Sequence, residues 1–204
     1  MKKYVEWGRE TIEAEIKALS ACAARLDESF SLAAREIAAC KGKVIVSGVG
    51  KSGRVGEKMA ATFASLGCPS FFMHAGEALH GDSGMMDGRD LLIVVSNSGE
   101  TVEAMATARK AKELGLKVIA MTGRKGSAIA KIADATIDIG VEREADPLGL
   151  APTSSSTVTM AVGDALAVAV ARAKGFSKAD FAARHPGGAL GKISSRQTGG
   201  DRKK

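Results

Sequence analysis

Short apolar runs alternate with helical segments along most of this chain, and this alternation limits the possible folds more than any other feature. Five runs have the composition of strands, at residues 43–49, 69–73, Leu91–Val95, 117–121 and 135–139. Strands that are apolar along their whole length are buried on both faces, which is typical of a parallel sheet covered by helices. We therefore expect an α/β fold, a three-layer αβα sandwich around a five-stranded parallel sheet.

The segments between the strands show the spacing of helices. Residues 3–39 contain no proline and place Ile12, Ile16 and Leu19 at roughly helical intervals, which predicts one continuous helix. Further helices are expected over 54–66, 100–114, 127–133 and 176–184, from after Pro152 to about Ala173, and as a single turn over 75–79.

The size and composition indicate one domain. With 204 residues, 45% of them hydrophobic, the chain can bury a full core; we expect one domain over 1–193 and a basic, disordered tail over 194–204. A net charge of +6 that is concentrated near the ends, with one Trp and one Tyr, argues against a nucleic-acid partner. Three widely spaced cysteines indicate core residues in a reducing compartment. With no signal sequence and no membrane-length apolar run, we expect a soluble, cytoplasmic protein.

A loop rich in hydroxyl groups follows the strand Leu91–Val95. It contains Ser96, Asn97, Ser98 and Thr101 and leads into a predicted helix. The start of a helix offers unpaired backbone N–H groups and the positive end of the helix dipole. One hydroxyl would be enough to cap the helix, so three within six residues favour a phosphate-binding loop.

The loop over 48–53 matches two nucleotide-binding patterns, and its context fits neither. G-x-G-x-x-G is present, but a dinucleotide site also needs an acidic residue after the second strand, where His74 stands instead. A Walker A loop would need glycine in place of Ile45. What remains is a tight glycine turn that brings the backbone close to a small ligand, with Lys51 beside it.

Other polar residues lie in loops after predicted strands or near the end of the fold. Glu100 and Glu103 open the predicted helix after the hydroxyl loop, where carboxylates complement the helix dipole. The dipole alone accounts for Glu100, whereas Glu103, three residues later and close to the same face, is a candidate to face the ligand. A charged loop holds Glu142 and Glu144, and five successive hydroxyl residues then span 153–157. Because ligands of parallel α/β folds bind beyond the carboxyl ends of the strands, we expect one composite site from the loops 48–53, 74–84, 96–101 and 142–152.

In combination, these motifs resemble sugar isomerase (SIS) domains, a flavodoxin-like fold that binds phosphosugars. The more particular strings resemble the arabinose 5-phosphate isomerase branch: Gly50-Lys51-Ser52-Gly53, His80-Gly81-Asp82, Ala151-Pro152-Thr153-Ser154-Ser155 and His185-Pro186-Gly187-Gly188-Ala189-Leu190-Gly191. The resemblance runs from about residue 10 to residue 192. Members of this branch commonly continue into a pair of CBS domains, so we expect a stand-alone form of the isomerase domain or a truncated one.

The resemblance implies an enzyme that interconverts D-arabinose 5-phosphate and D-ribulose 5-phosphate through an enediol, for 3-deoxy-D-manno-octulosonate synthesis. It implies a homotetramer with sites shared between subunits and no cofactor. Three histidines scattered over loops also show no metal-ligand spacing. The alternatives are another phosphosugar isomerase or a non-catalytic phosphosugar sensor.

Motif matching also suggests which residues form the site. The expected catalytic set is Lys51, His80, Glu103, Glu144 and His185, with Glu103 and Glu144 as the leading candidates for the base. A histidine is expected as the acid or ring-opening group, and Lys51 as a partner of the enediolate or the phosphate. The expected substrate-binding residues are Gly50, Ser52, Ser96, Asn97, Ser98, Thr101, Thr153 and Ser154.

Overall fold

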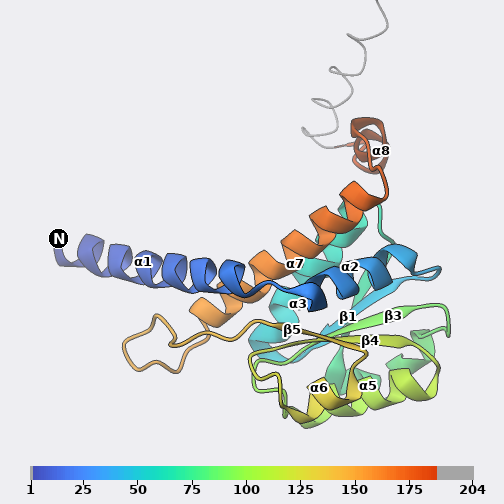
Figure 1. Ribbon diagram of the computed structural model, residues 1–204, viewed down its shortest axis with the longest axis horizontal. Coiled ribbons are helices and arrows are strands. Elements are labelled where there is room, and N and C mark those ends of the chain that lie inside the picture. The colour runs from blue at the N-terminus through green and yellow to red at the C-terminus, as the bar shows by residue number, and fades with distance from the viewer. Residues whose placement is uncertain (1, 188–204) are drawn as a thin grey trace, which may run out of the picture.

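A five-stranded parallel sheet forms the centre of the protein (Figure 1). The structure, a computed structural model, describes residues 2–187, so the expected tail over 194–204 lies outside the described residues. The strands are β1 (Val44–Gly48), β2 (Ser70–His74), β3 (Leu91–Val95), β4 (Lys117–Thr122) and β5 (Ala135–Asp138), in the order β2-β1-β3-β4-β5. All four pairings between these strands are parallel, which confirms the predicted sheet.

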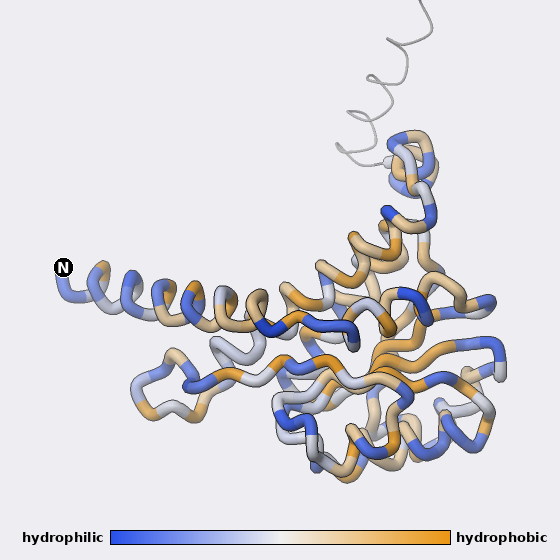
Figure 2. The backbone as a smooth tube through the Cα atoms, viewed as in Figure 1, coloured by the Kyte–Doolittle hydropathy of each residue, from blue (hydrophilic) through white to orange (hydrophobic). Residues whose placement is uncertain are grey.

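Helices cover both faces of the sheet, as predicted. On one face lie α2 (Glu28–Ala39), α3 (Gly50–Ser65) and α7 (Ser154–Ala173), and on the other α4 (Ala75–Ala78), α5 (Val102–Glu113) and α6 (Ala128–Ile132) (Figure 1). Alternate side chains of a strand serve the two layers. Val46 packs in the first cluster with Phe63, whereas its neighbour Ile45 packs in the second with Ala108. Figure 2 shows the apolar strands at the centre of the molecule.

The prediction of one helix over 3–39 is wrong. The structure has α1 (Lys2–Arg25) and then α2, separated at Leu26 and Asp27. Asp27 is in an extended conformation and accepts a hydrogen bond from the backbone N–H of Ser29, so it caps the start of α2. The new direction lets α2 bury Ala33 and Ile37 against the sheet.

The first half of α1 stands away from the body of the protein (Figure 1). Over the whole described length of α1, Cys22 is the only buried residue. Five large apolar side chains are exposed along α1: Tyr4, Val5, Trp7, Ile12 and Ile16. The rings of Tyr4 and Trp7 pack edge to face.

Three further helices begin two or more residues from the expected start. Helix α5 starts at Val102 instead of residue 100. Helix α3 starts at Gly50, four residues before the predicted start, and α8 (Lys178–Arg184) begins after a capping box of Ser177 and Asp180.

Among the described residues, α7 is the one helix long and apolar enough to cross a membrane, but it packs against α1, α2 and α3. The apolar composition of α7 is therefore explained by its place in the core.

Candidate active site

The strand order creates a crevice between the carboxyl ends of β1 and β3. From β1 the chain crosses to β2 on one side, and the next strand, β3, lies on the other side of β1. Loops that leave neighbouring strands in opposite directions leave room for a ligand between them. The two loops at this point are 48–53 and 96–101, two of the four loops that the sequence predicts for the site.

A small pocket of about 130 Å³ lies at this crevice. Lys51 and Ser52 line it from the start of α3, Asn97 from the loop after β3, and Ser155 and Ser156 from the start of α7. A volume of this size has room for a group as large as a phosphate. The pocket thus unites three segments that are far apart in the sequence.

The hydroxyl loop is held by its own side chains. Ser96 Oγ lies 2.9 Å from Thr101 Oγ1 and accepts a 3.1 Å hydrogen bond from the backbone N–H of Gly99. Ser98 Oγ accepts a bond from the backbone N–H of Glu100 at 3.2 Å. Ser96 is buried, whereas Asn97 and Ser98 are exposed toward the surface. Ser96 and Thr101 therefore shape the loop, and Asn97 is its member that lines the pocket.

The start of α6 supports the same loop from the other side. The Ile129 N–H donates to the Gly99 carbonyl at 3.1 Å, and the Ala128 N–H donates to Glu100 Oε1 at 2.9 Å. Glu100, which lies before the start of α5, therefore caps α6. Ser127 is buried and lies against Gly99.

The glycine turn after β1 brings the backbone close to the neighbouring strand. A Cβ on Gly48 would lie 3.1 Å from the Val95 carbonyl oxygen and 3.2 Å from the Gly53 nitrogen. Gly50 has a φ of +58°, in the left-handed region that glycine adopts without strain. These glycines let α3 begin directly at the crevice, and Lys51 is exposed in its first turn.

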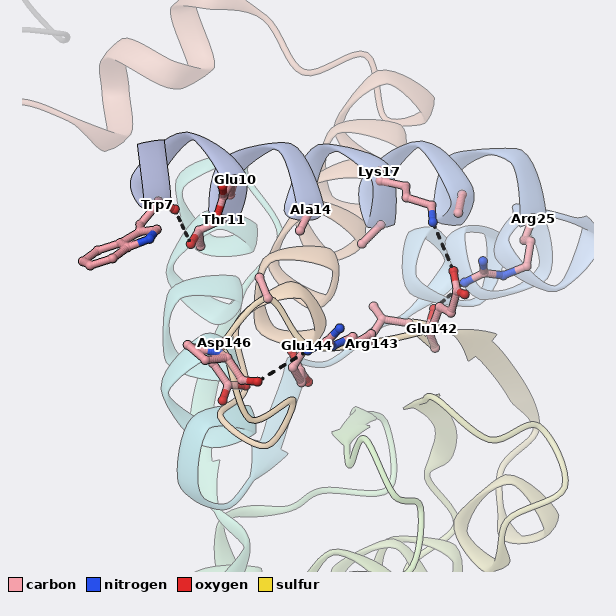
Figure 3. A pocket seen from close by; sticks show the side chains of 16 residues that line it. Trp7, Glu10, Thr11, Ala14, Lys17, Arg25, Glu142, Arg143, Glu144 and Asp146 are labelled. Carbon is pink, nitrogen blue, oxygen red and sulfur yellow. Dashed lines mark hydrogen bonds and ion pairs between the residues drawn. The ribbon is translucent and has the colours of Figure 1, made fainter. Parts of the chain in front are cut away.

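Glu144 caps the start of α7. Its Oε2 atom accepts hydrogen bonds from the Thr153 N–H at 2.9 Å, the Thr153 hydroxyl at 3.2 Å and the Ser155 N–H at 3.1 Å. Burial raises the pKa of Glu144, but the hydrogen bonds from Ser155 and Thr153 outweigh it and hold the pKa below its ordinary value. The side chain also borders a larger groove between α1 and residues 140–147 (Figure 3).

Glu103 and His80 lie on the α5 side of the sheet. Glu103 is exposed in the first turn of α5, two residues after Thr101. His80 is exposed just after α4, which packs against α5. His74, at the end of β2, accepts a bond from the Gly76 N–H through Nδ1 and so caps α4, a role that its sequence position alone did not suggest.

The structure does not bring His185 to the pocket of its own chain. His185 Nε2 lies 2.7 Å from Ser65 Oγ, at the last residue of α3, and its ring stacks on Phe181. Lys51 is at the opposite end of α3, fourteen residues away, which is about 21 Å along a helix axis. Residues 188–191, the rest of that motif, lie outside the described residues.

The run of hydroxyl residues over 153–157 is used differently from the prediction. Ser155 and Ser156 line the pocket, whereas the Thr153 hydroxyl bonds within its own loop and to Glu144. Ser154 is fully buried, and its hydroxyl has no hydrogen-bond partner among the described residues. The composition of the run indicated the site, but the rotation of α7 decides which members face the pocket. Val55, Pro152 and Thr159 complete the lining and were not predicted.

Comparison with known proteins agrees with this geometry. The family model of the SIS domain matches residues 36–169, which include β1 to β5 and the loops around the pocket. This chain belongs to the SIS domain family. As an SIS domain, it has the parallel sheet and the loop placement that its sequence predicts.

Curated relatives and a solved structure extend the similarity. The chain is 51% identical over 185 residues to arabinose 5-phosphate isomerase KdsD of Escherichia coli O157:H7, a match covering 91% of this chain and 56% of KdsD. It is 49% identical to arabinose 5-phosphate isomerase GutQ of Salmonella typhi, over 90% of this chain and 57% of GutQ. The chain thus spans little more than half the length of these relatives. A protein of E. coli CFT073, solved in complex with arabinose 5-phosphate, superimposes with a TM-score of 0.88 at 43% identity, covering 91% of this chain and 98% of that one.

Proposed function

We propose that this SIS domain is an aldose–ketose isomerase that interconverts D-arabinose 5-phosphate and D-ribulose 5-phosphate. The observation that carries the proposal is the small pocket at the crevice, where Lys51, Ser52 and Asn97 meet the first turn of α7. The pocket has the size of a phosphate group, and it combines a cation with polar groups and two helix starts. The identity of about 50% to KdsD and GutQ supports the choice of substrate.

The reaction moves a proton between C1 and C2 of the sugar through an enediol. One of these carbons is oxidised as the other is reduced, so no external oxidant or reductant is needed. It needs a carboxylate that takes the proton and returns it, and an acid that serves the two oxygens. We propose that the phosphate binds beside Lys51 and Ser52 and that Glu103 and His80 lie toward the carbon end of the sugar. Lys51 is the cation available to the phosphate or to the developing enediolate oxygen.

His185 belongs to the expected catalytic set but lies at the far end of α3. We propose that it serves the site of a neighbouring subunit, in a homotetramer with shared sites. The exposed apolar side chains along α1, such as Tyr4 and Ile16, support an interface between copies of this chain. Leu148 and Leu150, in the loop before α7, are also more than three-quarters exposed.

In the cell, we propose that the aldose product supplies the synthesis of 3-deoxy-D-manno-octulosonate in the cytoplasm. The names of the relatives support the reaction on which this role depends. The three cysteines are free thiols in the described structure, which fits a reducing compartment.

The first experiment mixes the purified, metal-stripped protein with D-arabinose 5-phosphate and measures the formation of ribulose 5-phosphate. Ribose 5-phosphate and glucose 6-phosphate serve as control substrates. We expect selective turnover of arabinose 5-phosphate. Turnover of a different sugar phosphate would indicate another phosphosugar isomerase, and tight binding without turnover of any of them would indicate a sensor.

A further inference from the structure

Glu144 lies at the boundary between two hollows of different size. The larger, of about 1010 Å³, runs between α1 and residues 140–147, and Figure 3 shows Glu144 beside Arg143 and Asp146 in its wall. The smaller is the pocket at the crevice, whose wall includes Ser155 and Ser156. Among the described residues, those that line the small pocket include neither Glu144 nor Glu103.

The hydrogen bonds of Glu144 concentrate on one oxygen atom. Oε2 accepts from two backbone N–H groups of the α7 start, those of Thr153 and Ser155, and from the Thr153 hydroxyl. Thr153 Oγ1 in turn accepts a hydrogen bond from the Ala145 N–H at 2.8 Å, which ties together the two ends of the loop between Glu144 and α7. A base that must take a proton from carbon has to present a free oxygen to that carbon. Oε2 is fully occupied by the helix, so Oε1, which has no hydrogen-bond partner among the described residues, is the one oxygen left for other contacts.

Helix α7 also needs this carboxylate for its own start. It is 20 residues long, has no acidic residue in its first turn, and its N-cap residue Thr153 makes no side-chain capping bond. An acidic group at a helix N-terminus is stabilised by the helix dipole and satisfies otherwise unpaired N–H groups. Glu144 supplies that group from nine residues before the cap.

Ser155 connects Glu144 to the small pocket. The Ser155 N–H bonds to Glu144, and Ser155 together with Ser156 forms the α7 side of the pocket. A shift of the first turn of α7 would therefore move this wall relative to Lys51. Small displacements of groups that bind a substrate are costly for catalysis.

We propose that Glu144 is a positioning residue, which fixes the first turn of α7 beside the phosphate pocket, and that the proton transfer falls to Glu103, which the proposed function places toward the carbon end of the sugar. The inference rests on the proposed isomerase function. The lowered pKa of Glu144 agrees with it, because a carboxylate held ionised by hydrogen bonds is a weaker base.

The two roles predict different results for Glu144→Gln and Glu144→Ala. A glutamine keeps a carbonyl oxygen that accepts from the Thr153 and Ser155 N–H groups, but it cannot act as a base; alanine does neither. For a positioning residue we expect Glu144→Gln to lower kcat by no more than about tenfold and to raise KM, and Glu144→Ala to lower kcat/KM by more than about a hundredfold. Glu103→Gln should lose at least about a hundredfold in kcat.

Proton exchange tests the chemistry directly. In deuterated water, an enzyme that abstracts the carbon-bound proton incorporates deuterium at C1 or C2 of the sugar, which NMR detects. We expect Glu144→Gln to retain this exchange and Glu103→Gln to lose it. The matched control is Glu142→Gln: this carboxylate lies two residues away, is 86% exposed and pairs with Lys17 on the surface, so exchange should equal that of the original protein.

Amide hydrogen exchange supplies a readout that does not depend on turnover. We expect the amides of Thr153 and Ser155 to lose protection strongly in Glu144→Ala and weakly in Glu144→Gln. If Glu144→Gln abolishes deuterium incorporation while these amides stay protected, Glu144 is the base and the inference is overturned. If the unsubstituted protein converts none of the sugar phosphates, the proposed function fails instead, and unchanged amide protection in Glu144→Ala would then overturn the positioning role on its own.

Discussion

Gly99 and Ser127 are in such close contact that no side chain fits on Gly99. A Cβ there would overlap the Ser127 side chain and lie 2.8 Å from Thr122 Oγ1. The φ of Gly99 is +70°, a region that residues with a side chain rarely adopt. The hydroxyl loop beside the pocket thus depends on one glycine for both its backbone conformation and its packing against α6.

We therefore expect Gly99→Ala to destabilise the protein by about 1–3 kcal/mol and to weaken phosphosugar binding. Thermal unfolding and a binding titration with arabinose 5-phosphate measure the two effects. Gly126→Ala is the control, since Gly126 has a negative φ and no atom within 4 Å of an added Cβ. Equal stability and affinity of the two variants would contradict the packing argument.

Lys51 is expected to attract the phosphate through its charge. Lys51→Met should raise KM by at least about tenfold, because a charged hydrogen bond contributes about 1.5–3 kcal/mol. The effect should shrink as salt is added, since salt screens an exposed charge. Lys131→Met, on α6 and outside the pocket lining, removes the same charge and should leave KM unchanged. A KM that is independent of Lys51 would place the phosphate elsewhere.

Sharing of sites between subunits predicts complementation. At substrate concentrations well below KM, Lys51→Met and His185→Gln should each turn over substrate much more slowly than the original protein, and a mixture in which subunits exchange should recover part of the activity. Glutamine at position 185 retains a hydrogen-bonding group for Ser65, which limits the loss of stability. The measurement is turnover before and after the two variants are dissociated and reassembled together. An unchanged rate after proven exchange would show that His185 does not serve a neighbouring site.

Asp134 links α5 to the sheet and gives the stability a dependence on pH. Burial alone would raise the pKa of Asp134, but bonds from the Lys112 ammonium and the Val118 N–H, together with the charge of Lys117, hold the pKa below its ordinary value. A lowered pKa in the folded state stabilises the protein above the unfolded pKa of about 3.9, and this contribution disappears as the pH falls further.

Asp134→Asn should consequently unfold more easily at pH 7, by about 1–2 kcal/mol, and the difference should vanish toward pH 2. Urea unfolding at several pH values measures it. Glu113→Gln on the surface of α5 loses only an exposed pair with Lys110 and should cost at most about 1 kcal/mol. A deficit of Asp134→Asn that does not change with pH would exclude the electrostatic explanation.

The sequence predicts the sheet well because buried parallel strands leave a local signal. All five predicted strands agree with the structure to within one residue at either end. The break before α2 was missed because the helical spacing continues through Asp27, and only the packing of Ile37 shows why the chain turns there. The early start of α3 was missed because glycines disfavour helix in general, although here they bring the helix to the crevice.

The candidate site was predicted less completely, since its geometry depends on contacts between distant segments. Hydroxyl runs at 96–101 and 153–157 are visible in the sequence, but the phase of α7 selects Ser155 and Ser156 for the pocket. Glu144 caps α7 through bonds to Thr153 and Ser155, which follow it by nine and eleven residues. No local sequence pattern predicts a cap across such a loop. The remote position of His185 follows from the packing of α8 beside the end of α3.

The walls of the small pocket come from both layers of the sandwich. Lys51 and Ser155 belong to helices on one face of the sheet, and Asn97 lies in the loop that leads into α5 on the other face. A ligand that contacts all three binds only when both layers are assembled, so partly unfolded forms that release either layer have no affinity for it. Added ligand should therefore raise both the midpoint and the cooperativity of unfolding. When the ligand is abundant, the two helical layers should unfold together in a single transition.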